Sequence, residues 1–97
     1  MIVNIHKTGD NKKIVAVCDK DLIGKKFEEK NLQLDLASGF YKGEEKSEED
    51  TVRIFRDAYI INFVGKNSVN IGLKHGIISK DSVIYIRKIP HAQAVLA

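Results

Sequence analysis

Residues 1–7 alternate between apolar and polar side chains, the period of a strand with one buried face. The sequence Thr-Gly-Asp-Asn at 8–11 follows, and these residue types tolerate the backbone dihedrals of tight turns. Residues 14–18 (Ile-Val-Ala-Val-Cys) are then apolar without interruption. The pattern predicts an antiparallel hairpin over residues 1–18, with a second strand that is central and buried on both faces.

The next segment predicts a short helix and a third strand. Asp19 is a good N-cap residue, because its carboxylate can accept a free backbone N–H, and the apolar spacing after it predicts a helix through Phe27. Leucines at every second position predict a strand over residues 32–36. Residues 40–43 (Phe-Tyr-Lys-Gly) are expected to form a loop or a short edge strand.

The clearest helical signal begins at Ser47, an N-cap residue followed by three acids that oppose the positive end of the helix dipole. Apolar residues recur at helical spacing through Phe55 and beyond. We predict that residues 47–64 form the longest helix, with Asn62 on its apolar face. Gly65 is expected to end this helix, as glycine often does.

A second short helix is expected from Ser68, and a strand over residues 82–88. Pro90 should end the pairing of that strand and turn the chain, because proline has no N–H and a fixed φ. Residues 92–96 are expected to pack back on the sheet. The order of elements predicts an α+β fold in one domain, residues 1–97. Its small antiparallel or mixed sheet should have helices packed mainly on one face.

Composition agrees with one ordered domain. Of 97 residues, 43% are hydrophobic and 30% are charged, which supports one core without disulfides. One cysteine is present, so no internal bridge can form, and a lone thiol fits a reducing compartment. No apolar run is long enough to span a bilayer, and the start of the chain lacks the pattern of a signal peptide. We therefore expect a cytoplasmic protein that has no membrane partner.

Charge is unevenly distributed around a net charge of +3. The middle third of the chain is acidic and both ends are basic, with three adjacent basic pairs. Basic side chains beside exposed aromatic rings are what binding to single-stranded RNA requires. This hypothesis assigns RNA contact to Lys12, Lys13, Lys25, Lys26, Tyr41, Arg87 and Lys88. It depends on the pairs sharing one face.

Catalytic and metal-binding patterns are weak. The chain has no His-x-x-x-His or Cys-x-x-Cys pair and no glycine-rich phosphate loop, so we expect no metal and no cofactor. Cys18 lies where a strand meets a helix start, a position that can activate a thiol. Its simpler interpretation is a small buried hydrophobe. No catalytic residue is assigned, and whether the protein is an enzyme stays open.

The segment Pro90-His91-Ala92-Gln93 combines a rigid residue, an imidazole and an amide. Imidazole and amide groups together can orient a small polar ligand or a phosphate. We predict that Asn62, His91 and Gln93 lie close together and line a polar pocket, with His91 partly exposed and titrating near neutrality. The alternative is that these side chains simply face water.

Four segments carry a family resemblance: CDKDLIGKKFEE, LQLDLASGFYKG, NFVGKNSVNIGLKHGII and VIYIRKIPHAQAVLA. In this order and spacing the chain resembles the archaeal domain-of-unknown-function 424 family over nearly its whole length. The resemblance implies a small archaeal cytoplasmic protein and no particular reaction, cofactor or site. The chain departs from the family where Lys88-Ile89 precede Pro90, since the resemblance implies a glycine-containing turn there.

Three functions stay open at this point. The first is a non-catalytic binding module that contacts RNA or a ribonucleoprotein. The second is a small enzyme or small-ligand binder that uses His91 and Gln93. The third is a protein-interaction subunit that uses the acidic helix or an exposed strand edge. The oligomeric state does not follow from the sequence.

Overall fold

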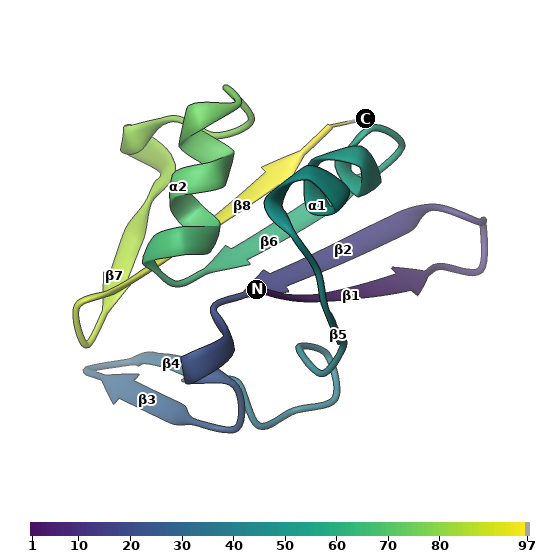
Figure 1. The fold of residues 1–97 in the computed structure, drawn as a ribbon. Helices are drawn as coiled ribbons and strands as arrows, with labels where there is room; N and C mark the ends of the chain where they lie inside the picture. Colours follow the sequence, from purple (N-terminus) through teal and green to yellow (C-terminus); the bar gives the residue numbers. More distant parts are fainter. Residues whose placement is uncertain (97) are drawn as a thin grey trace.

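The structure, a computed structural model, describes residues 1–96 and is built on a six-stranded mixed sheet (Figure 1). Across the sheet the order is β5 (Glu44–Glu45), β1 (Ile2–Lys7), β2 (Lys13–Cys18), β6 (Ile60–Val64), β8 (Ile89–Val95) and β7 (Ile84–Ile86). Only β2 and β6 pair in parallel. A separate antiparallel pair consists of β3 (Lys26–Glu29) and β4 (Leu32–Asp35). The predicted α+β class and mixed sheet are confirmed.

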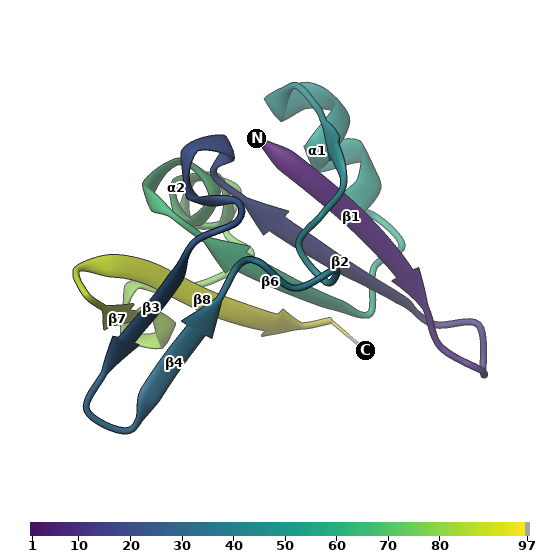
Figure 2. The same ribbon diagram turned by 90° about the horizontal axis from the view of Figure 1, so that it is seen from below.

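Two helices, α1 (Glu48–Phe55) and α2 (Lys66–Lys74), cover one face of the sheet (Figure 1). They enclose the larger core with side chains such as Val15, Ile61 and Phe63. The β3–β4 pair and the loop after it cover part of the opposite face (Figure 2) and close a second core around Cys18 and Val64. The sheet is therefore buried on both sides at its centre, as the apolar run at 14–18 predicts. None of the helices in residues 1–96 combines the length and apolar character needed to cross a bilayer.

The N-terminal hairpin is confirmed. Strands β1 and β2 pair from Ile2 opposite Cys18 to Lys7 opposite Lys13. The turn is closed by the Thr8 amide, which donates to the Lys12 carbonyl oxygen at 2.9 Å.

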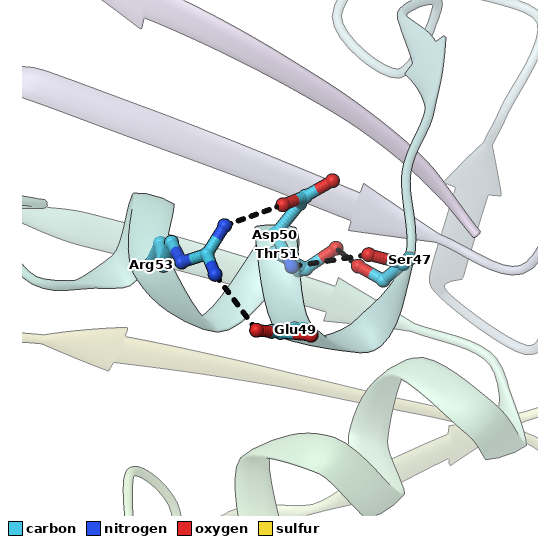
Figure 3. A network of polar contacts seen from close by, with 5 residues as sticks. All are labelled: Ser47, Glu49, Asp50, Thr51 and Arg53. Carbon is cyan, nitrogen blue, oxygen red and sulfur yellow. Dashed lines mark hydrogen bonds and ion pairs between the residues drawn. The ribbon is translucent and has the colours of Figure 1, made fainter.

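Helix α1 starts where the sequence predicts. The Ser47 hydroxyl accepts from the Asp50 amide at 3.2 Å, and Arg53 forms ion pairs with Glu49 and Asp50 on the exposed side (Figure 3). The helix ends at Phe55, however, so the prediction of a helix to residue 64 is wrong. Asn62 belongs to strand β6, which lies between β2 and β8, because a run of apolar and β-branched residues fits a central strand better than a helix.

The helix predicted from Asp19 to Phe27 is also wrong. Only one 3-10 turn forms, η1 (Lys20–Leu22), and Gly24 follows with φ +86, which breaks the helical path. Phe27 lies in β3 opposite Leu34 of β4, so the strand predicted over 32–36 is confirmed. Residues 40–43 form a loop that leads into the short edge strand β5.

Pro90 does not end the last strand. The chain reverses two residues earlier, at Arg87 and Lys88, and Pro90 pairs with Tyr85 inside β8. In a hairpin with a two-residue turn, the residues that flank the turn, Ile86 and Ile89, form a hydrogen-bonded pair. The next pair, Tyr85 and Pro90, is then a non-hydrogen-bonded pair, so the missing N–H of proline costs no hydrogen bond between these strands. After Ser79, a single 3-10 turn, η2 (Lys80–Ser82), leads into β7.

Candidate functional site

The predicted trio of polar side chains comes together on the sheet face opposite the helices. Asn62 and Gln93 are directly opposed on β6 and β8, and His91 lies two residues before Gln93, opposite Val64. Alternation along β8 places His91 and Gln93 on the same face, while the buried Ala92 and Ala94 pack in the helix-side core. Asn62, His91 and Gln93 are therefore brought close together by the pairing of β6 with β8, and not by the end of a helix at Gly65.

The trio lines none of the five most pronounced hollows in residues 1–96, which are lined by other side chains. His91 is half-buried, and its Nδ1 atom is buried without a hydrogen-bond partner in the described part of the chain. Burial lowers the pKa of His91 below its usual value, so the imidazole is neutral at neutral pH. Ligand binding by Asn62, His91 and Gln93 stays a prediction.

Two of the three basic pairs converge at one end of the sheet. Arg87 and Lys88 form the β7–β8 turn, and the Arg87 side chain reaches β3, where its Nε donates to the Glu28 carbonyl oxygen at 2.7 Å. Lys26 of β3 and Arg87 line one open hollow of about 510 Å³. Lys25, which precedes β3, completes this group.

A further lysine joins the group from the helix side. Lys66 is the first residue of α2, and it lines a hollow of about 280 Å³ together with Lys88, Pro90 and the acidic residues Asp19 and Asp21. Lys66 was not among the predicted contacts, because it is not part of a basic pair and lies between a helix expected to end at Gly65 and one expected to begin at Ser68. Strand β6 and helix α2 meet there instead. We call the cluster Lys25, Lys26, Lys66, Arg87 and Lys88 the basic end.

The basic end differs from the rest of the surface in its charge pairing. All five side chains are exposed, and within residues 1–96 no carboxylate forms a salt bridge with any of them. Several cations elsewhere are paired, for example Lys13 with Asp57 at 2.7 Å and Lys74 with Glu48 at 2.9 Å.

Carboxylates also lie at this end: Asp19 and Asp21 line the smaller hollow, Glu28 lines the larger one, and Glu29 accepts a hydrogen bond from the Arg87 amide at 2.9 Å. The five cations therefore form no ion pairs within residues 1–96, but negative charge lies nearby.

The remaining predicted RNA contacts lie elsewhere. Lys12 and Lys13 lie at the end of β2 that is next to the hairpin turn. Cys18, at the other end of β2, is about 17 Å away along the strand and pairs with Val64, close to Lys66 of the basic end. The Lys12 ammonium lies over the Tyr59 ring, 4.3 Å from its centre. Tyr41 is only 8% exposed and packs in the second core, so its ring offers no stacking surface. The three basic pairs do not share one face.

The start of α2 is held by a side chain from a distant segment. The Asp19 carboxylate accepts from the Asn67 amide at 3.0 Å, and from the amide and hydroxyl of Ser68, both at 2.8 Å. Asp19 is 6% exposed and Ser68 is fully buried. Asp19 was predicted to cap a helix of its own; it caps α2 instead, and so fixes the position of Lys66. This carboxylate also occupies the helix N-terminus that would otherwise attract an external anion.

Cys18 is fully buried at the end of β2, beside this cap. Burial raises the pKa of its thiol to about 12, and the neighbouring Asp19 and Asp21 charges act in the same direction. We predict that a thiol reagent at neutral pH labels the folded protein slowly and the unfolded protein quickly. Mass spectrometry after timed labelling, with and without denaturant, measures the two rates. Rapid labelling without denaturant would show that the thiol is accessible and reactive.

Comparison with known proteins places the chain in a family. No curated protein matches it. A crystal structure of an uncharacterized conserved protein from Methanopyrus kandleri is similar, with 27% sequence identity and a TM-score of 0.80. The alignment covers 95% of this chain and 87% of that one. The organism from which that protein comes agrees with the archaeal origin that the resemblance implies. The model of a family described as proteins of unknown function, DUF424, matches residues 6–96, and the chain therefore belongs to this family.

Proposed function

We propose that this protein is a non-catalytic binding module that contacts the phosphate backbone of RNA, alone or in a ribonucleoprotein, through the basic end. The observation that carries the proposal is a group of exposed cations without ion pairs in residues 1–96 around the β7–β8 turn. Lys26 and Arg87 line one hollow there, Lys66 and Lys88 line another, and Lys25 precedes Lys26 in the chain. Lysine and arginine at such a surface release counterions when they neutralise phosphates, which drives binding without base recognition.

The β7–β8 turn adds a second argument. Arg87 and Lys88 have φ values of +52° and +65°, the left-handed conformation of a two-residue hairpin turn that asparagine and glycine usually occupy. Holding an ordinary L-residue there costs about 1–2 kcal/mol per position. The chain thus accepts backbone strain where two positive side chains project from the basic end. Under this proposal a functional need for charge offsets the cost at this turn; Lys30 in the β3–β4 turn has a similar φ of +55° without belonging to the basic end.

Removing two of these cations tests the proposal. In Lys66→Ala/Lys88→Ala, we expect weaker binding to a fluorescein-labelled oligouridylate. We also expect the slope of log K against log salt to become shallower by about 1.4, which is 0.7 for each lost contact to a single strand. Fluorescence anisotropy over a range of salt concentrations measures both changes.

Lys7→Ala/Lys12→Ala is the matched control, because it removes the same formal charge from the other end of the sheet. This variant should keep nearly the wild-type salt slope. Equal slopes in the two variants would assign the attraction to net charge and not to the basic end. Absence of wild-type binding at low ionic strength would refute the proposal.

A further inference from the structure

Tyr85 is the most exposed of the seven Phe and Tyr residues, with 61% of its surface accessible to solvent. It belongs to neither core, and its hydroxyl has no hydrogen-bond partner within residues 1–96. Val83, two residues earlier on the same face, packs against the helix-side core. Core packing therefore accounts for an apolar side chain at Val83, whereas it does not account for an aromatic side chain at Tyr85.

The position of Tyr85 connects it to the basic end. Its partner across the hairpin is Pro90, which lines the same hollow as Lys66 and Lys88. The pair is of the non-hydrogen-bonded kind, in which opposing side chains come closest, so Tyr85 neighbours a residue of this hollow without itself lining it. Figure 1 shows the β7–β8 turn and the start of α2 at the same end of the molecule.

An exposed ring next to unpaired cations can bind one strand of a nucleic acid in two ways at once. The ring offers a flat face on which a base stacks, and the cations neutralise the phosphates that flank that base. A base inside a duplex is already stacked on its neighbours and cannot use the ring. The combination therefore discriminates between single strands and duplexes.

We propose that the basic end is specific for single-stranded RNA and that Tyr85 stacks on an unpaired base, with Lys66 and Lys88 on the adjacent phosphates. This inference rests on the proposed function, since it assigns the form of RNA that the same surface binds. The RNA hypothesis requires an exposed aromatic ring. Tyr41 is buried and cannot supply one, whereas Tyr85 does.

Substitution of the ring separates stacking from charge. Tyr85→Leu should weaken binding to an oligouridylate about fivefold or more, because it removes the aromatic face and keeps an apolar side chain. Tyr85→Phe should bind within about twofold of wild type, since phenylalanine stacks without a hydroxyl. Tyr59→Leu is the control: this ring lies at the other end of the sheet, under Lys12. The wild-type protein should prefer the single strand to a duplex of the same length.

Tyrosine fluorescence provides an independent measurement, because the chain has three tyrosines and no tryptophan. Oligouridylate should quench the emission of the wild-type protein and of Tyr59→Leu, and should quench Tyr85→Phe much less. If Tyr85→Leu binds as tightly as wild type, or if duplex and single strand bind equally, the stacking inference fails while salt-dependent binding still supports the proposed function. If no RNA binds, both proposals fail.

Discussion

Replacement of Asp19 by alanine is expected to lower the free energy of unfolding by about 2–4 kcal/mol. The substitution leaves the Asn67 and Ser68 amides and the Ser68 hydroxyl without their acceptor, at a site that is almost fully buried. A chain of this size loses about 4–8 °C of melting temperature per kcal/mol, so the Tm should fall by about 8–32 °C. Thermal and urea unfolding followed by circular dichroism measure the effect.

Asp19→Asn is the matched variant. Its amide oxygen can still accept from Ser68, but its NH2 group cannot accept from the Asn67 amide and the negative charge at the start of α2 is lost. We expect it to be less stable than wild type and more stable than Asp19→Ala. An Asp19→Ala protein within about 0.5 kcal/mol of wild type, the range of ordinary surface substitutions, would mean that this carboxylate does not hold α2 in place.

Gly65→Ala should be at least as damaging, with an expected cost of about 3 kcal/mol or more. Gly65 has φ +104° and ψ 160°, a conformation that is essentially restricted to glycine. An added Cβ would also overlap the carboxyl group of Asp19. Backbone strain and steric overlap therefore add to each other at the residue that links β6 to α2. Urea unfolding measures the cost, or shows that the variant does not fold.

Gly76→Ala provides the control, because Gly76 also has a positive φ, +69°, but an added Cβ would meet nothing within 4 Å. Its cost should be the strain alone, about 1–2 kcal/mol. In the double variant Asp19→Ala/Gly65→Ala, the combined cost should be smaller than the sum of the single costs, because the carboxyl group that overlaps the new Cβ is gone. Equal costs for Gly65→Ala and Gly76→Ala would contradict the close contact between Asp19 and Gly65.

Periodicity predicted the parts of the fold that are decided locally. The alternation in residues 1–7 and the turn after it specify the N-terminal hairpin, and Ser47 specifies the start of α1. The end of α1 was not predictable in this way, because residues 52–62 fit a helical stripe as well as they fit a strand. Pairing on both sides with β2 and β8 resolves that ambiguity, and it depends on residues far away in the chain.

The site was predicted in part for the same reason. Asn62, His91 and Gln93 do share one face, although through strand register that no local pattern encodes. Arg87 and Lys88 were recognised as a basic pair, whereas the turn that they form was expected at Pro90. Asp19 is a residue type that often caps helices, but the helix that it caps is α2, which begins at Lys66. Only folding brings Asp19 and the start of α2 together.

The central claim, that the basic end binds RNA, is tested most directly by an NMR titration of the ¹⁵N-labelled protein with an oligouridylate at low salt. We predict amide shift changes at residues 65–67 and 85–89, with little change at residues 7–13 of the opposite hairpin turn. Raising the salt concentration should reverse the shifts, since they arise from phosphate neutralisation. Shifts centred on residues 7–13, or spectra that do not change with RNA at low salt, would contradict the account.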